Sequence, residues 1–213
     1  MNSGLLLVNK PRGVTSHDVV QIVRRRLGVP RSGHTGTLDP MAEGLLIVLI
    51  GKATAHQQAF QSHEKTYEAT LRLGVQTYTG YATVKTIRTA PVPAGYHRRA
   101  ADVLASFVGP LSQTPPAYSA VKVQGRPAYW WARRDRPVTL APRSVHCFEM
   151  ILRACEPGAI IFQVRCSAGT YVRTLGEAIA ERLGTVGHLT RLVRLRIGGW
   201  RVEEAKPLSW IER

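Results

Sequence analysis

Residues 33–50 read GHTGTLDPMAEGLLIVLI. They join a glycine-rich loop to the longest apolar run of the chain, Leu45 to Ile50. Gly33 and Gly36 allow the backbone to approach a ligand closely or to turn with positive φ. The apolar run predicts a buried strand or a buried helical segment, and periodicity does not separate the two. The stretch therefore predicts a core element that follows a tight polar loop.

Asp39 lies in this loop, directly before Pro40. Proline fixes its own φ and disfavours helical backbone in the preceding residue, so the carboxylate would project from a stiff segment. A purely structural interpretation is also open: Asp39 as the N-cap and Pro40 as the first residue of a helix over residues 41–45. His34 and Asp39 are too few ligands for a metal site, so no metal is expected.

Outward from this stretch, apolar spacing and turn residues predict short strands interleaved with helices. Strands are predicted over residues 5–8, 66–73, 118–123, 151–154, 160–166 and 191–200, the last with one basic edge. Helices are predicted over residues 15–27, with Thr15 or Ser16 as the cap, and over 53–61, 99–108, 129–134 and 171–183. Residues 28–43 and 76–97 are predicted loops, and 112–116 a turn. Strands adjacent in sequence predict an α+β fold with a mixed, mainly antiparallel sheet flanked by helices.

Charge is the strongest compositional signal. The chain has 213 residues, 29 Lys and Arg against 14 Asp and Glu, a net charge of +15 and a pI near 10.6. Six of the 29 are lysine and the other 23 are arginine, whose planar guanidinium binds phosphates and stacks on bases. This imbalance predicts a polyanionic partner, most simply a nucleic acid. An arginine-rich codon usage is the alternative explanation.

Composition excludes several classes of protein. An apolar fraction of 44% and a charged fraction of 20% exclude a disordered tail. The apolar run is too short to cross a bilayer, and residues 1–10 lack the charged start of a secretory signal. Cys147, Cys155 and Cys166 have no metal-binding spacing and predict reduced thiols. We expect a cytoplasmic monomer with a single domain over residues 1–213.

Arg173 lies at a position that is unfavourable for a cation. It falls in the first turn of the predicted helix, where the helix dipole disfavours a cation. A nearby anion would explain it; an exposed arginine reaching solvent is the alternative. Tyr171 lies at the same helix mouth, whereas Tyr67 on its alternating strand would ordinarily be a core residue. Lys10 opens a turn after the first strand.

Residues 118–136 interleave aromatic and basic side chains. Tyr129, Trp130 and Trp131 lie between Arg126 and Arg133. This pattern suits base stacking and phosphate contact in RNA, although Trp130 could equally pack inward.

Six blocks of the sequence resemble, in order, the TruB family of tRNA pseudouridine synthases. They read GLLLVNKPRGVTSHDVV (4–20), SGHTGTLDPMAEGLL (32–46), EKTYEATLRLG (64–74), TPPAYSAVKVQGRPAY (114–129), CSAGTYVRTLG (166–176) and HLTRLVRLRIGGW (188–200). GHTGTLDP and the later CSAGTYVR are the most specific. The resemblance implies a catalytic core with a cleft along the sheet, which isomerises a uridine, expected to be uridine 55 in the T-arm of tRNA, without any cofactor.

The resemblance also implies catalytic roles. Asp39 would be the carboxylate that engages the uridine during glycosidic cleavage, with Arg173 as its partner, which would lower its pKa and keep it ionised. Tyr67 would stack on the flipped uracil and handle the proton at C5.

Binding roles follow from the same resemblance. His34 would hold the space that the base leaves, or bind the flipped nucleotide. Tyr171 and Leu192 would line the uracil pocket, and Lys10 with Pro11 would support the catalytic loop.

The chain departs from the family pattern at three places. A T-D-T-x-D-x-x-G block is replaced by residues 77–83, TYTGYAT, with Tyr78 and Tyr81 instead of acids, and Ala178 replaces an aspartate in the last predicted helix. The usual C-terminal RNA-binding domain is not expected within these 213 residues. The lost acids support an alternative, a non-catalytic RNA-binding or tRNA-folding protein on the same fold.

Overall fold

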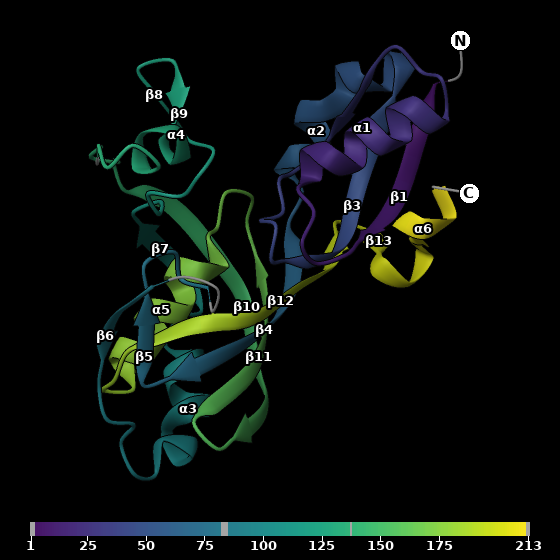
Figure 1. Ribbon diagram of the computed structural model, residues 1–213. Helices are drawn as coiled ribbons and strands as arrows, with labels where there is room; N and C mark the ends of the chain where they lie inside the picture. The colour runs from purple at the N-terminus through teal and green to yellow at the C-terminus, as the bar shows by residue number, and fades with distance from the viewer. Residues whose placement is uncertain (1–2, 82–84, 137, 212–213) are drawn as a thin grey trace. The chain divides into compact units, whose positions relative to one another are not determined.

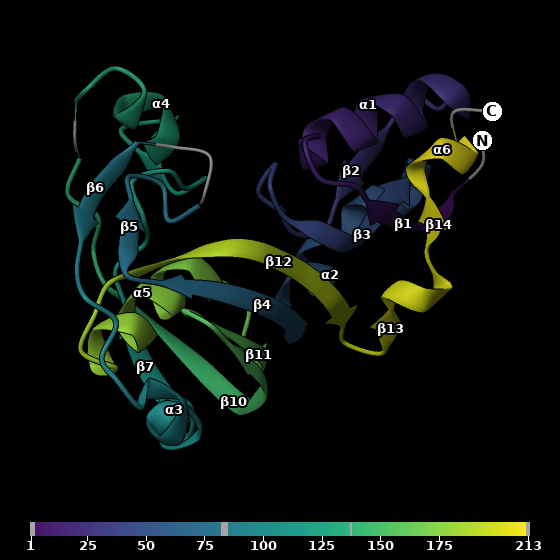
Figure 2. The same ribbon diagram turned by 60° about the horizontal axis from the view of Figure 1, so that its bottom comes forward.

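The computed structural model describes residues 3–81, 85–136 and 138–211. The chain forms two compact units: Met1–Glu68 with Arg191–Arg213 make the first unit, and Ala69–Thr190 the second (Figure 1). Two neighbouring strands, β4 (Lys65–Leu73) and β12 (Gly187–Ile197), continue from one unit into the other and lie side by side in Figures 1 and 2.

The first unit is a sheet with helices on it. Besides the ends of β4 and β12, its elements are β1 (Gly4–Lys10), α1 (Ser16–Arg26), β2 (Ser32–His34), β3 (Glu43–Ile50), η1 (Gly51–His56), α2 (Gln57–Ser62), β13 (Trp200–Arg201), η2 (Val202–Glu204), β14 (Lys206–Pro207) and α6 (Leu208–Ile211). The strand order is β14-β1-β3-β12, with β2 also paired to β3. β1 and β2 run antiparallel to β3, whereas β12 runs parallel to it, with Arg194 opposite Gly44.

The apolar run of β3 reflects burial on both of its faces. Leu46, Val48 and Ile50 pack in one cluster with Val19 and Val23 of α1. The alternate residues 45, 47 and 49 pack in a second cluster on the opposite face, with Phe60 and Trp200. A strand covered on both faces needs a continuous apolar sequence rather than an alternating one. Of the two predicted alternatives for residues 45–50, the strand is therefore correct.

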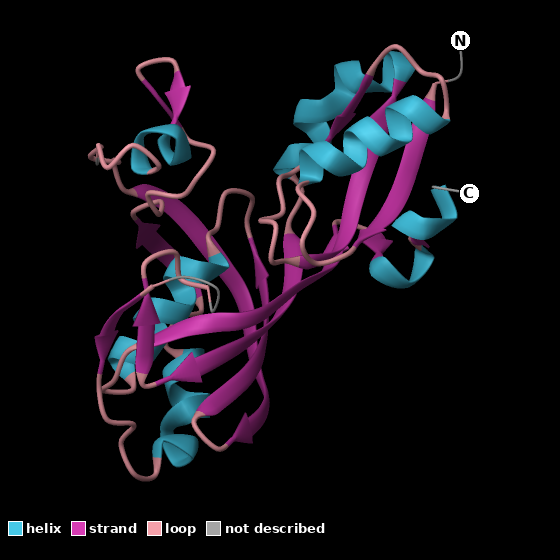
Figure 3. Ribbon diagram, viewed as in Figure 1, coloured by secondary structure: helices cyan, strands magenta, loops and turns pink. Residues whose placement is uncertain are grey.

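The second unit holds the longest strands. Besides the remainder of β4 and β12, its elements are β5 (Val75–Thr77), β6 (Thr86–Thr89), α3 (Tyr96–Ala105), β7 (Gly109–Gln113), β8 (Lys122–Val123), β9 (Arg126–Pro127), α4 (Ala128–Ala132), β10 (Arg143–Glu156), β11 (Ala159–Cys166) and α5 (Val172–Arg182). The sheet order is β12-β4-β11-β10-β7, and β10 is antiparallel to both of its neighbours. β5 with β6 and β8 with β9 form small separate hairpins, the second directly before α4 (Figure 3).

Small residues bring α5 close to the sheet. A Cβ on Gly176 would lie 3.0 Å from Leu189 Cδ2, and a Cβ on Gly187 would lie 2.8 Å from Ala180 Cβ. The apolar face predicted for this helix is buried, including Val172, Leu175 and Ile179. The amphipathic pattern and its end at Gly184 are therefore confirmed, as is the α+β class with a mainly antiparallel sheet.

Several local predictions are wrong. No helix occupies residues 41–45, because a turn at Pro40 and Met41 leads directly into β3. The predicted loop over 76–97 contains β5, β6 and the start of α3, although residues 82–84 lie outside the described chain. Within the predicted turn at 112–116, Ser112 and Gln113 belong to β7, and the strand predicted over 118–123 is reduced to β8. Short exposed strands such as β6 carry no apolar alternation, so sequence periodicity does not reveal them.

Candidate active site

The loop that carries Asp39 is held by its own backbone. Leu38 N donates to Ser16 Oγ at 2.8 Å, and Ser16 Oγ donates back to Leu38 O at 3.1 Å. Pro40 O accepts from Gly13 N at 2.7 Å, and Asp39 O accepts from Ala42 N at 3.0 Å. These bonds fix the backbone on both sides of a half-buried Asp39, so the carboxylate extends from a rigid segment. The N-cap interpretation of Asp39 is wrong, since a strand follows it.

Ser16 is a site-supporting residue that the sequence analysis treated as a possible cap. Thr15 is the N-cap of α1 and forms a capping box with Asp18. Ser16 is 2% exposed and uses its hydroxyl on the Asp39 loop instead. The motif spacing contains no signal for this contact, because it joins positions 22 residues apart in sequence.

Lys10 contacts the same loop through its side chain. Its side chain is fully buried, and Nζ donates to the carbonyl oxygens of Pro11 at 2.9 Å, Val14 at 2.8 Å and Pro40 at 3.4 Å. Burial, followed by the charge of Arg194, lowers the pKa of Lys10 from 10.5 to about 8, against the opposing effect of Asp39. The ammonium therefore links the end of β1 to the residue that follows Asp39.

The buried Lys10 should make stability depend on alkaline pH. Between the folded pKa of about 8 and the ordinary value of 10.5, the unfolded chain binds a proton that the folded chain has released. The free energy of unfolding should therefore rise with pH across this window, by at most about 3 kcal/mol. Urea unfolding of wild type and of Lys10→Met at pH 7.5 to 10.5 measures this rise. The difference between their free energies of unfolding gives the contribution of Lys10 at each pH. The exposed Lys52→Met is the matched control and should keep the rise; parallel curves for wild type and Lys10→Met would contradict the prediction.

Arg194 is a second buried cation beneath the loop, and the sequence analysis missed it. It was placed on the basic edge of the strand over residues 191–200, yet its side chain is 1% exposed. Its Nε donates to Leu45 O at 2.7 Å, and its Nη2 donates to Gly36 O at 3.0 Å. Of the basic residues in that predicted strand, Arg191 and Arg196 are exposed and Arg194 is buried, so the predicted basic edge is wrong for Arg194.

Three further predicted residues belong to the first unit. His34 on β2 accepts a 3.4 Å hydrogen bond at Nδ1 from Gly36 N, and burial together with the charge of Arg194 lowers its pKa, so the ring is neutral near pH 7. Tyr67 on β4 and Leu192 on β12 are both buried, at 9% and 5% exposure. Neighbouring strands therefore carry the predicted stacking residue and a predicted pocket residue.

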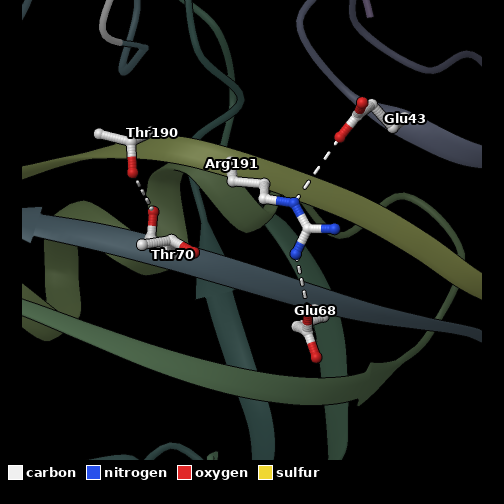
Figure 4. Close-up of polar contacts among 5 residues, drawn as sticks. All are labelled: Glu43, Glu68, Thr70, Thr190 and Arg191. Carbon is white, nitrogen blue, oxygen red and sulfur yellow. Dashed lines mark hydrogen bonds and ion pairs between the residues drawn. The ribbon is translucent and has the colours of Figure 1, made fainter. Parts of the chain in front are cut away.

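Arg191 ties β12 to its neighbours next to Leu192. Its Nη1 lies 2.9 Å from Glu68 Oε1 on β4, and its Nε lies 3.7 Å from Glu43 Oε2 on β3 (Figure 4). These side chains are partly exposed, so the pairs add little stability but favour one register of the strands. Further along the same strands, Thr190 Oγ1 donates to Thr70 O at 3.3 Å (Figure 4).

Arg173 occupies the first turn of α5 in the second unit. The exposed-arginine alternative is wrong, because the side chain is 4% exposed. Its Nη1 donates to Thr79 O at 3.1 Å, and its Nη2 donates to Tyr118 O at 2.9 Å. The guanidinium also lies 5.3 Å from the ring centroid of Tyr81. Arg173 thereby joins two loops to the start of the helix.

The positions of the lost acids are explained in part. Tyr81 presents its ring to Arg173, and Tyr78 makes an edge contact with Tyr118 at a centroid distance of 5.7 Å. Burial raises the pKa of half-buried Glu177 on α5, and the positive charge of Arg173 opposes this rise without cancelling it.

Tyr171 is the N-cap residue of α5, and its backbone is held on both sides. Its N donates to Gln113 Oε1 at 3.0 Å, and its O accepts from Gln113 Nε2 at 3.3 Å. The predicted site residues thus divide between the units: Asp39, His34, Lys10, Tyr67 and Leu192 in the first, Tyr171 and Arg173 in the second. The pairing of Asp39 with Arg173 stays a prediction.

The second unit carries a compact basic and aromatic surface, which we call the Trp130 cluster: Arg126, Tyr129, Trp130, Arg133 and Arg134. Arg134 lies 3.8 Å and Arg126 5.4 Å from the Trp130 ring centroid, and Arg133 lies 5.5 Å from that of Tyr129. Trp131 anchors the cluster by donating from Nε1 to Val123 O at 3.1 Å. Trp130 is half-buried, so it is not packed fully inward.

The described residues contain neither a metal-binding cluster nor a helix that could span a membrane. Within residues 3–81, 85–136 and 138–211, no three His, Cys, Asp or Glu side chains lie close enough to hold a metal ion. None of the helices in these ranges has the length and apolarity to cross a membrane.

Comparison with known proteins agrees with the resemblance. A family model described as TruB family pseudouridylate synthase (N terminal domain) matches residues 24–172. The tRNA pseudouridine synthase B of Hydrogenovibrio crunogenus is 44% identical over 209 residues, covering 98% of this chain and 69% of the relative. The protein of the same name from Aromatoleum aromaticum is 45% identical over 209 residues, covering 98% and 68%.

Solved structures extend the likeness to the fold. A chain in the crystal structure of a Cbf5-Nop10-Gar1 complex superposes with a TM-score of 0.75 at 30% identity, covering 97% of this chain and 52% of that one. A chain of an H/ACA RNP bound to a substrate RNA containing 2′-deoxyuridine has a TM-score of 0.72 at 26% identity, covering 97% and 51%. This chain thus spans about half the length of those two. Given the family model, the identities and the fold together, the chain belongs to the TruB family of pseudouridylate synthases, which are isomerases.

Proposed function

We propose that this protein isomerises a uridine of tRNA to pseudouridine, with uridine 55 of the T-arm as its target. The observation that carries the proposal is Asp39, a half-buried carboxylate on a loop whose backbone is bonded at residues 38, 39 and 40. A rigidly held carboxylate suits a reaction in which the nucleophile must meet one carbon atom of a bound sugar or base. The names of the two relatives described above support tRNA as the substrate.

The reaction conserves every atom of the uridine except for proton exchange at C5. The C1′–N1 bond breaks, the uracil rotates, the C1′–C5 bond forms, and the C5 proton is lost to solvent while N1 gains one. Asp39 engages the ribose or the base during cleavage. Tyr67 stacks on the uracil and handles the C5 proton, and the reaction needs neither an oxidant nor a co-substrate.

The free uracil must be confined during its rotation. Tyr171 and Leu192 line its pocket, and His34, neutral near pH 7, holds the space that the base leaves or binds the flipped nucleotide. The uridine lies inside a folded RNA arm and must be flipped out, which costs a few kcal/mol. Stacking and phosphate contacts offset this cost, and the net charge of +15 favours them.

RNA affinity should fall steeply with salt. Each phosphate that an Arg or Lys neutralises releases counterions, so several contacts predict a loss of about a hundredfold or more between about 50 and 200 mM salt. Filter binding of a T-arm stem-loop measures the slope of log affinity against log salt. Arg126→Gln in the Trp130 cluster should reduce that slope by about one. A flat salt response of the wild-type protein would rule out binding through phosphates.

The enzyme is tested by tritium release from a T-arm stem-loop that carries uridine labelled at C5. Release to solvent is expected with this stem-loop and not with one in which cytidine replaces uridine 55. Binding without release would favour the non-catalytic RNA-binding alternative, for which the replaced acids at Tyr78, Tyr81 and Ala178 are the supporting observation. We expect the protein to act as a cytoplasmic monomer.

A further inference from the structure

Arg194 is a buried arginine among the buried apolar residues of its strand. Its strand neighbours Leu192, Val193 and Ile197 are all buried, and Arg194 is more deeply buried than Leu192 or Val193. Removing a guanidinium from water is unfavourable unless good hydrogen bonds compensate, and an apolar residue of similar volume is often at least as stable. A buried arginine at this position therefore calls for a reason other than stability alone.

The two bonds of Arg194 reach different elements. Nε donates to Leu45 O at 2.7 Å in β3, and Nη2 donates to Gly36 O at 3.0 Å in the loop that leads to Asp39. One rigid fork thus bridges the core strand and the loop. The close crossing is made possible by Gly44, where a Cβ would lie 2.3 Å from Arg194 O.

Arg194 binds the first half of the Asp39 loop, where few other hydrogen bonds are described. Ser16 binds Leu38, and Lys10 binds Pro40, so both act next to Asp39 or after it. At residues 35 and 36, the described bonds are Thr35 N to Ile47 O at 3.1 Å, Gly36 N to His34 Nδ1 at 3.4 Å and Arg194 Nη2 to Gly36 O at 3.0 Å. Arg194 also lowers the pKa of both Lys10 and His34.

We propose that Arg194 is a positioning residue for Asp39: its guanidinium locks the first half of the aspartate loop to β3 and so sets where the carboxylate points. This inference rests on the proposed function, in which Asp39 reacts with the uridine. A lysine at position 194 would keep the charge, but its single ammonium cannot present two donors in the fixed geometry of the guanidinium.

The test is Arg194→Lys, compared with Arg196→Lys, an exposed arginine two residues along the same strand. With enzyme in excess over the labelled T-arm stem-loop, the single-turnover rate of tritium release should fall about a hundredfold in Arg194→Lys, since a displacement near 1 Å is enough for that loss. The dissociation constant should stay within about threefold, because binding rests on phosphates elsewhere. Arg196→Lys should match the wild-type protein in both.

Amide hydrogen exchange separates positioning from general stability. In Arg194→Lys the amides of Thr35 to Leu38 should lose protection, while those of Leu46 to Leu49 in β3 keep it. A rate within about threefold of wild type, or an equal loss of protection in loop and strand, would overturn the proposal. The exchange result also stands if the wild-type protein releases no tritium, so failure of the proposed function and failure of this inference remain distinguishable.

Discussion

Asp39→Asn is expected to lower tritium release from the labelled T-arm stem-loop by at least about a thousandfold. The amide has nearly the same shape as the carboxylate but is not an effective nucleophile or anion, so chemistry is lost while the fold is kept. The loop contacts described above involve the backbone of Asp39 and of its neighbours, which the substitution leaves in place. RNA affinity should change by no more than about threefold, because it depends mainly on phosphate contacts.

The control for Asp39→Asn is Asp102→Asn, which removes the same charge from an exposed position on α3. It should release tritium at the wild-type rate. Release by Asp39→Asn at a tenth of the wild-type rate or more would contradict the assignment of the nucleophile. Equal tritium release by Asp39→Asn and Asp102→Asn would show that Asp39 has only a structural role.

Arg173→Lys is expected to lower the single-turnover rate by about a hundredfold and to destabilise the protein by about 1–3 kcal/mol. A lysine ammonium cannot satisfy Thr79 O and Tyr118 O together in the geometry that the guanidinium adopts. One of the two loops would therefore lose its anchor at the mouth of α5, and the proposed partner of Asp39 would be displaced.

Arg182→Lys is the matched control, since it makes the same replacement at an exposed position near the end of the same helix. Its urea unfolding midpoint and its rate should stay close to wild type. A rate for Arg173→Lys close to wild type would refute a role in positioning or pairing with the aspartate. A loss of stability with an unchanged rate would leave Arg173 as a purely structural anchor.

The loop in which the acids are replaced still contributes partners to Arg173. Tyr81 presents its ring to the guanidinium, and Thr79 O accepts a hydrogen bond from Nη1. Arg173 therefore retains contacts with this loop although the sequence pattern of the loop has changed.

Local signals determined much of this protein from the sequence alone. Helices α1 and α5 followed from apolar spacing and terminal residues, because helix formation depends on side chains three and four positions apart. The apolar run of β3, the excess of arginine and the motif around Asp39 were likewise visible without coordinates. Motif resemblance then turned Asp39 from a candidate cap into a candidate nucleophile.

The tertiary structure decided the features that depend on contacts between residues far apart in the sequence. β3 became a strand because two separate clusters cover its two faces, which no local pattern reports. Ser16 and Arg194 joined the site because they reach Leu38 and Gly36, which are 22 and 158 positions away. Arg194 resembles its exposed neighbours in sequence, yet the parallel pairing of β12 with β3 buries it against backbone carbonyl groups. Sequence spacing reports which residues share a face of one element, whereas burial of a charge depends on the element that covers that face.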